Sequence, residues 1–387
     1  MRQARALRIA ILAHSTNPRG GVVHALELGD ALVRLGHEAV VHAPDVRGSG
    51  FFRPTLCGSA LVAASPVGAD LATMIETRVA EYVSHFETAA NRRFDVFHAQ
   101  DGISANALAT LKQWGLIDRF ARTVHHIDDF EDPKVAALQA RSIAAADELF
   151  VVSGTWRDIL RRRFGRSATI VGNGVDGGRF APTPDGREEG LRSRLGLGEG
   201  PVFLSIGGIE ERKNTLRLLE AFDEVRRMLP AAQLIVAGGA SVLDHGAYQR
   251  RFAAALARMA VPPGAVVTTG PLPDDDMPAL YRLASALVFP SVKEGFGLAV
   301  IEAMACGVPV VLSKIAPFTE HIGDDDVIWC DPMRAASIAD AMLIAIAEPS
   351  RARLARQGRL VALRHDWDAT ARAHLPIYMR LREAIHA

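Results

Sequence analysis

Two glutamates in the second half of the chain have a setting that suits a phosphorylated ligand. Glu294 lies in the loop KEGFG at residues 293–297, and Glu302 follows in the helix that we expect over Leu298–Ala305. The two glycines leave backbone amides accessible and the start of the helix carries positive potential, so the loop favours a bound anion. The two carboxylates can therefore contact different parts of one elongated ligand.

A pair of cations earlier in the chain has a similar setting. Arg212 and Lys213 follow an apolar run at Val202–Ile206 and two glycines, and a helical pattern comes next. Two cations beside backbone amides are suited to a diphosphate. The alternative is an exposed pair at the start of a helix, where cations oppose the helix dipole. We therefore favour a phosphate-binding function for this pair.

In the first half of the chain, Gly20 and Gly21 lie between an apolar run at Leu7–Ala13 and a helical pattern. Such a loop also suits an anion, because the free amides of the helix start point at the ligand. The loop lacks the GxGxxG spacing, and no acidic residue at the end of the second strand is placed for a ribose, so a dinucleotide site is only weakly indicated. A simple tight turn is an equally good interpretation of this loop alone.

The segment HHIDDFEDP at residues 125–133 carries two histidines and four carboxylates. Neighbouring histidines do not easily bind one ion, and adjacent acids often begin a helix, so we interpret the segment as the lining of an acceptor site. By similar reasoning Asp274–Asp276 is expected to cap a helix and Asp324–Asp326 to form a turn. The three cysteines are far apart in the sequence and have no ligand spacing. No metal site is predicted.

Short apolar runs alternate with helical patterns along the whole chain, which predicts doubly wound parallel sheets with strands buried on both faces. The alternation starts at Leu7–Ala13 and restarts at Val202–Ile206. Residues 173–201 are rich in glycine, proline and charge, which predicts two α/β domains in tandem with a cleft between them. The segment 47–67 has little periodicity, and the tail at 351–387 is helical by pattern. Further strands are predicted at Ala39–Ala43, Asp95–His98, Arg122–His125, Glu148–Val152, Thr169–Val171, Gln233–Ala237, Val266–Thr268, Ala286–Phe289, Val308–Leu312 and Val327–Cys330.

Composition excludes several classes of protein. Of 387 residues, 49% are apolar and 23% are charged, which is ordinary for a globular protein and excludes disorder and coiled coils. The 44 basic residues balance the 44 acidic ones, whereas a nucleic-acid-binding protein usually has a basic excess. The longest apolar stretch, 295–312, contains Glu302 and is not a membrane span. The three cysteines show no disulfide framework, so a reducing cytosol is the expected compartment.

Two further segments bear on location. The basic start of the chain and its short apolar run fit a first strand better than a signal peptide. Residues 156–164, WRDILRRRF, are typical of a basic amphipathic helix that touches anionic lipid. Runs of charge are more often solvated surfaces, and we favour that interpretation.

Taken together, these motifs resemble those of retaining glycosyltransferases of the GT-B fold, family 4, over nearly the whole chain. The most specific feature is the spacing of Glu294 and Glu302 within EGFGLAVIEAMACGVPVV at 294–311. Further motifs occur in the order that the family has them: Gly20-Gly21, Asp95–Asp101, Thr123–His125, Val152-Ser153, Asn173–Asp176 and Arg212–Asn214.

The resemblance implies two Rossmann-like domains that face a central cleft and enclose a nucleotide-diphospho-sugar. The first domain would comprise residues 1–176, completed by a crossover helix at 366–387. The second domain, residues 177–365, would bind the nucleotide sugar.

The resemblance also implies a role for each candidate residue. Arg212 and Lys213 would neutralise the phosphates in place of a metal, Glu294 would hold hydroxyls of the donor sugar, and Glu302 would bind the ribose. His125 would lie near the transferred carbon. Backbone amides would contact the sugar and the phosphates at Gly20, Gly21, Gly295, Phe296, Gly297 and Leu298.

The implied activity is that of a metal-independent hexosyltransferase, which moves a sugar from a UDP- or GDP-sugar with retention of configuration. The acceptor is unidentified and could be a sugar, a lipid-linked sugar or a small molecule. Many family members carry arginine where Gly208 stands, so here Arg212 and Lys213 have to supply the positive charge. The departing phosphate would take the acceptor's proton, so the two glutamates are not the nucleophile and acid of a glycosidase.

Two other activities stay open from the sequence: a GT-B sugar-nucleotide epimerase and a non-catalytic nucleotide-sugar-binding protein. No cofactor and no nucleic-acid partner are expected. The expected location is the cytoplasm, with peripheral contact to the inner face of the membrane as a further option.

Overall fold

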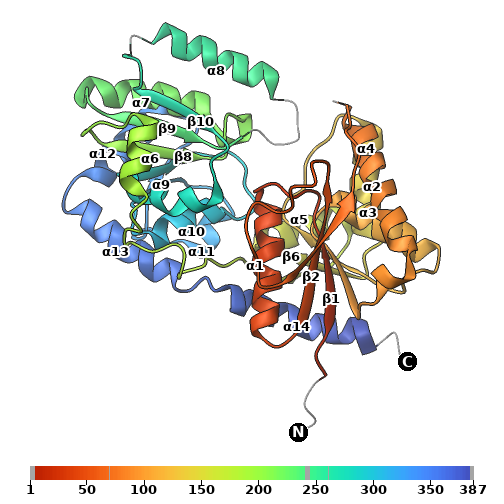
Figure 1. Ribbon diagram of the computed structural model, residues 1–387. Coiled ribbons are helices and arrows are strands. Elements are labelled where there is room, and N and C mark those ends of the chain that lie inside the picture. The colour runs from red at the N-terminus through yellow and green to blue at the C-terminus, as the bar shows by residue number, and fades with distance from the viewer. Residues whose placement is uncertain (1–4, 69, 240–244, 260, 384–387) are drawn as a thin grey trace. The chain divides into compact units, whose positions relative to one another are not determined.

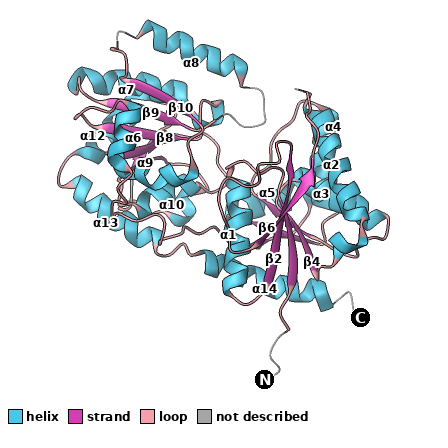
Figure 2. Ribbon diagram, viewed as in Figure 1, coloured by secondary structure: helices cyan, strands magenta, loops and turns pink. Residues whose placement is uncertain are grey.

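The computed structural model describes residues 5–68, 70–239, 245–259 and 261–383. The chain divides into two compact units (Figure 1). Unit 1 consists of Met1–Asn173 together with Trp367–Ala387, and unit 2 consists of Gly174–Asp366. Each unit is built around one sheet with helices on both of its faces (Figure 2).

The sheet of unit 1 has seven strands in the order β3-β2-β1-β4-β5-β6-β7, and all neighbouring pairs are parallel. Strand β1 (Arg8–Leu12) lies inside the sheet, and its side chains from Ile9 to Leu12 form an unbroken run of buried apolar residues, as expected for a strand that is covered on both faces. The strands are β1 (Arg8–Leu12), β2 (Glu38–Asp45), β3 (Gly58–Ala63), β4 (Val96–Ala99), β5 (Ala121–Val124), β6 (Glu148–Val151) and β7 (Thr169–Ile170).

Six α-helices and a short 3₁₀ helix cover this sheet within the described residues. Local signals fix several helix starts: Asp132 accepts a hydrogen bond from the Lys134 amide, and Pro133 occupies the first helical position. The helix start predicted in the acidic segment is therefore confirmed. The helices are α1 (Gly20–Arg34), α2 (Leu71–Glu87), η1 (Ala89–Arg92), α3 (Gly102–Gln113), α4 (Pro133–Ala144), α5 (Gly154–Phe164) and α14 (Trp367–Glu383).

Helix α14 comes from the far end of the chain and packs beside α1 (Figure 1). An ion pair between Arg34 and Asp368 joins the two helices at 2.7 Å. Two fully buried histidines face each other at the same contact, His24 of α1 and His374 of α14, with ring centroids 6.1 Å apart. Burial lowers the pKa of His24 to about 4 and that of His374 to about 3.

The sheet of unit 2 has six parallel strands in the order β10-β9-β8-β11-β12-β13. The strands are β8 (Val202–Ile206), β9 (Gln233–Ala237), β10 (Val266–Gly270), β11 (Ala286–Phe289), β12 (Val310–Ser313) and β13 (Ile328–Cys330). The described helices are α6 (Glu188–Leu195), η2 (Glu211–Lys213), α7 (Thr215–Met228), α8 (Gly246–Arg258), η3 (Asp274–Asp276), α9 (Met277–Leu283), α10 (Leu298–Ala305), α11 (Phe318–His321), α12 (Ala335–Ile346) and α13 (Ser350–Ala362). The predicted doubly wound α/β architecture is thus confirmed.

The strand order reverses once in each sheet, between β1 and β4 in unit 1 and between β8 and β11 in unit 2. At such a reversal the helices on either side cross to opposite faces, and this opens a crevice beyond the carboxyl ends of the two strands. The loops that follow β8 and β11 carry Arg212, Lys213 and Glu294. The topology therefore brings these three residues to the position where open α/β sheets bind ligands.

Three expectations from the sequence require correction. Strand β3 lies in the segment that showed little periodicity, because it is an edge strand whose side chains are mostly exposed. Helix α6 occupies part of the predicted connection, anchored by the buried Leu191. Asp276 precedes α9 but does not cap it through its side chain, since its carboxylate is paired with Arg194.

Helix α5 contains the run of arginines that suggested contact with lipid. Trp156 and Leu160 on this helix are buried against the rest of unit 1, so its apolar side faces inward and its arginines lie toward solvent. Within the described residues, no helix combines the length and the apolar character needed to span a bilayer.

The buried histidines predict a loss of stability in acid. In the unfolded chain His24 and His374 have an ordinary pKa of 6.5, whereas in the folded protein their pKa values are about 4 and 3. The unfolded chain therefore binds more protons below pH 6.5, and the free energy of unfolding falls as the pH drops from 6.5 toward 4. We expect a loss of about 2 kcal/mol per histidine at pH 5.

Urea unfolding followed by tryptophan fluorescence at pH 7 and pH 5 measures this difference. His374→Leu should reduce it by about 2 kcal/mol. An identical difference in the variant and the wild type would contradict the assignment.

Candidate functional site

Three charged side chains of unit 2 converge beyond the carboxyl ends of β8 and β11. Glu294 Oε1 accepts hydrogen bonds from Lys213 Nζ at 2.5 Å and from Arg212 Nη1 at 3.2 Å. The Ser291 hydroxyl donates to the same oxygen at 3.1 Å. The Lys213 and Glu294 side chains are only 9% and 8% exposed, whereas that of Arg212 is 42% exposed. The cluster therefore joins a buried ion pair to a cation at the surface.

Burial and pairing act in opposite directions on the two buried charges. Burial disfavours the carboxylate of Glu294, but Lys213 and Arg212 outweigh it, so the pKa of Glu294 lies below its usual value. Burial lowers the pKa of Lys213, and the charge of Glu294 offsets part of that effect. Glu294 is therefore anionic at neutral pH and poorly suited to donate a proton.

Arg212 is held from its other side by Glu210, which the sequence pattern does not single out. The Glu210 side chain is 1% exposed and lies 2.9 Å from Arg212 Nε. A buried carboxylate needs a cation nearby, and Arg212 meets that need while its guanidinium also reaches Glu294. The signal for Glu210 in the sequence is only its position two residues before Arg212.

Glycines make room for the lysine. Gly207 has a φ of +117°, and a Cβ there would lie 2.5 Å from Lys213 Cε, so the Lys213 stem passes directly over this glycine. The Lys213 ammonium then lies 4.2 Å from the centroid of the Phe289 ring. The aromatic face and the carboxylate together hold the ammonium in one place.

Gly208 packs against the backbone of the neighbouring loop. It has a φ of +75°, and a Cβ there would lie 2.8 Å from the carbonyl oxygen of Gly239. An arginine at this position would be strained and would collide with backbone. The cations of this loop are accordingly Arg212 and Lys213.

Glu302 lies on α10, the helix that follows the loop of Glu294. This helix begins after Gly297, whose φ of +96° and contact with the Phe318 ring leave no space for a side chain. Glu302 Oε2 accepts a 2.6 Å hydrogen bond from the hydroxyl of Tyr281. The sequence pattern does not point to Tyr281, which lies 21 residues before Glu302.

Phe296, between the two glycines, is anchored inside unit 2. Its ring stacks on that of His321 with centroids 4.5 Å apart and an angle of 4°, and the His365 ring meets it edge-on at 5.5 Å. The Phe296 side chain thus serves packing, which leaves the backbone of residues 295–297 available to a ligand.

In unit 1 the structure brings together Gly21, His125 and Gln100. A Cβ on Gly21 would lie 3.5 Å from His125 Cδ2, so the first turn of α1 passes close to the imidazole. His125 Nε2 lies 3.0 Å from Gln100 Oε1, and because an amide oxygen only accepts, the proton is on Nε2. Burial and the neighbouring His24 hold the pKa of His125 well below 6.5, so the ring is neutral.

Gly20 is the first residue of α1, and the preceding Arg19 makes no side-chain cap. Gln100 is buried and follows β4 within the DVFHAQD run, but nothing in that run distinguishes it as a partner of His125. In the acidic segment, His126 lies 3.1 Å from Asp128. Across the described residues, no three or more histidines, cysteines or acids are placed so as to hold one metal ion.

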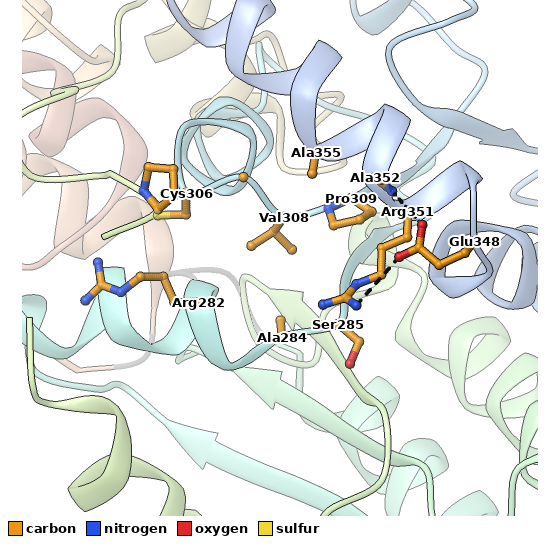
Figure 3. A pocket seen from close by; sticks show the side chains of 12 residues that line it. Arg282, Ala284, Ser285, Cys306, Val308, Pro309, Glu348, Arg351, Ala352 and Ala355 are labelled. Atoms are coloured by element: carbon orange, nitrogen blue, oxygen red, sulfur yellow. Dashed lines mark hydrogen bonds and ion pairs between the residues drawn. The ribbon is translucent and has the colours of Figure 1, made fainter. Parts of the chain in front are cut away.

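Unit 2 also contains a cavity of about 230 Å³, shown in Figure 3. None of the predicted site residues lines it. Its two arginines are already neutralised, Arg282 by Asp185 and Glu188 and Arg351 by Glu348. The cavity is therefore separate from the candidate site.

Family models match both halves of the chain. The model for glycosyl transferases group 1 matches residues 188–361, and the model for glycosyltransferase family 4 matches residues 18–179. The chain belongs to the glycosyltransferases that these two models describe. The region matched by the group 1 model contains the cluster of Lys213, Arg212 and Glu294 as well as Glu302.

Two relatives illustrate the range of the family. A GDP-mannose-dependent alpha-(1-6)-phosphatidylinositol monomannoside mannosyltransferase of Mycolicibacterium smegmatis is 34% identical over 54% of this chain and 55% of its own length. A D-inositol 3-phosphate glycosyltransferase of Salinispora arenicola is 30% identical over 65% of this chain and 58% of its own length. The chain thus matches little more than half the length of each.

Among solved structures, the sucrose-phosphate synthase of Thermosynechococcus elongatus is similar with a TM-score of 0.79. The sequence identity is 21%, and the match covers 98% of this chain and 100% of the other. This likeness confirms the predicted GT-B fold.

The packing of Gly208 yields a prediction. Gly208→Arg should lower the free energy of unfolding by about 1–3 kcal/mol, because a side chain at positive φ is strained and meets the Gly239 carbonyl. Urea unfolding measures the change. Gly190→Ala, at an open helical position in the same unit, is the control and should cost nothing. A Gly208→Arg protein as stable as the wild type would refute the clash.

Proposed function

We propose that the protein transfers a hexosyl group from a nucleotide-diphospho-sugar to an acceptor hydroxyl, with retention of configuration and without a metal. Membership of the glycosyltransferase family supports the general activity. The observation that carries the proposal is the convergence of Lys213, Arg212 and Glu294 at the strand-order reversal of unit 2.

The cluster has the charges that a departing diphosphate needs. Lys213 is nearly buried, so its ammonium acts in a medium where its attraction for a phosphate oxygen is stronger than in water. When the diphosphate binds, its oxygens compete with Glu294 for Lys213 and Arg212. Glu294 is then able to accept hydrogen bonds from hydroxyls of the donor sugar.

The reaction breaks the bond between the anomeric carbon and the phosphate oxygen and forms a bond from the acceptor oxygen on the same face. The electron pair of the broken bond stays on the phosphate, whose negative charge Lys213 and Arg212 stabilise. The acceptor's proton goes to that phosphate oxygen. Glu294, with its lowered pKa, is not a proton donor in this scheme. His125, a neutral ring with its proton on Nε2, is suited to hydrogen bonding rather than to carrying charge.

The names of the two relatives indicate which substrates to try first. One relative is described as GDP-mannose-dependent, so GDP-sugars are the first donors and UDP-sugars the second. Both names contain an inositol that carries phosphate, so an inositol phosphate and a phosphatidylinositol are the first acceptors.

A panel of nucleotide sugars tests the proposal. We expect one GDP- or UDP-sugar to raise the melting temperature and to release nucleoside diphosphate, at the same rate with and without EDTA, faster when acceptor is present. Binding without release under any condition would instead indicate a nucleotide-sugar-binding protein. Conversion of the sugar on its nucleotide would indicate an epimerase, and inhibition by EDTA would refute independence from metal.

Lys213→Ala tests the role of the cluster. If Lys213 stabilises the leaving diphosphate, kcat should fall about 100-fold or more, while donor affinity falls much less, because charge on the phosphate grows in the transition state. Lys314→Ala removes an exposed lysine from the same unit and should leave kcat unchanged. Loss of affinity with unchanged kcat would assign Lys213 to ground-state binding only.

A further inference from the structure

Tyr281 is a buried residue that directs its hydroxyl at the carboxylate of Glu302. It lies on α9, its side chain has no exposed surface, and its hydroxyl oxygen is 2.6 Å from Glu302 Oε2. The Phe180 ring meets the Tyr281 ring edge-on with centroids 5.9 Å apart. Packing thus fixes the phenol, and the phenol fixes the position of one carboxylate oxygen.

The direction of this hydrogen bond is determined. Burial and the nearby charge of Glu302 raise the pKa of Tyr281 well above 10, so the phenol keeps its proton. A carboxylate oxygen only accepts, and it can accept more than one hydrogen bond. Tyr281 therefore donates to Oε2 without preventing a ligand from donating to the same carboxylate.

A purely structural role is the simple alternative, because a buried hydroxyl needs a partner wherever it lies. The choice of partner argues against this interpretation. Glutamate on a helix has several staggered rotamers, and neighbours of Glu302 on α10 such as Ile301 and Ala303 are fully buried and pack into the core. Tyr281 selects one rotamer of the single acidic residue on that helix.

We propose that Tyr281 is a positioning residue for the donor site. It holds the carboxylate of Glu302 in the orientation that binds the ribose hydroxyls of the donor nucleotide, and so it contributes to the preference for ribonucleotides over deoxyribonucleotides. This inference rests on the proposed function, in which Glu302 binds the ribose. It adds a residue that touches no substrate and acts only through Glu302.

Calorimetric titration of the full-length protein tests the inference. The probes are GDP and UDP, each with its 2′-deoxy and 3′-deoxy counterparts. The proteins are wild type, Tyr281→Phe, Glu302→Gln, the double variant, and Tyr248→Phe, which removes another buried hydroxyl of unit 2, one that accepts from the Leu216 amide. Phenylalanine keeps the ring of Tyr281 in place, so the fold is retained.

For the ribonucleotide that binds, Tyr281→Phe should raise Kd about tenfold. It should raise Kd less than about twofold for the deoxy counterpart that has lost the hydroxyl contacted by Glu302, and less than about twofold in the Glu302→Gln background. Tyr248→Phe should change neither Kd.

Equal weakening of ribo- and deoxyribonucleotides by Tyr281→Phe would overturn the inference and leave Tyr281 as a packing residue. Additive effects of Tyr281→Phe and Glu302→Gln would overturn it as well. Failure of the wild type to bind any of the probes would instead refute the proposed function, and with it the premise of the inference.

Discussion

The contact between Lys213 Nζ and Glu294 Oε1 joins two loops that are 81 residues apart in the sequence. Taking two charges out of water is costly, and a buried pair persists only where further hydrogen bonds support it. Ser291 supplies one such bond to the glutamate, and the Phe289 ring faces the ammonium. This pair and the backbone hydrogen bond from the Val292 amide to the Arg212 carbonyl together join the loops after β8 and β11.

Backbone hydrogen bonds also hold in place the loop that leads from β8 to Lys213. The amides of Gly207 and Gly208 both donate to the carbonyl of Ala237, which ties the loop after β8 to the end of β9. Gly207 has no side chain, and the stem of Lys213 occupies the space that a Cβ at Gly207 would fill. Glycine thus contributes here by lacking a side chain, whereas Glu210 pairs with Arg212 and the Ser291 hydroxyl donates to Glu294.

The sequence predicts some parts of this molecule to the residue and others not at all. Strands β8 and β11 and helix α10 were expected at their observed bounds, because buried apolar runs and a flanking glycine or proline mark them. Strand β3 carries no such signal, since an edge strand needs few apolar side chains. At Asp276, a distant arginine prevailed over the local cap that the acidic run predicts.

Partners of the site residues are the least predictable part. Tyr281 meets Glu302 and Gln100 meets His125 because two helices or two strands lie side by side in the folded unit, not because of any local pattern. Family resemblance suggests which residues contact a ligand but not which residues orient them. Partners such as Tyr281 and Gln100 can be identified only from the folded structure.

The stacking of Phe296 on His321 has a consequence for how the protein can change. With that side chain committed to the interior, residues 295–297 offer a ligand only main-chain groups, and an amide is the same in every L-amino acid except proline. Under the proposed function, point mutation at residues 295–297 can therefore remove binding but has little means of altering which sugar is preferred. A shift of preference, in evolution or in the laboratory, has to come from side chains elsewhere.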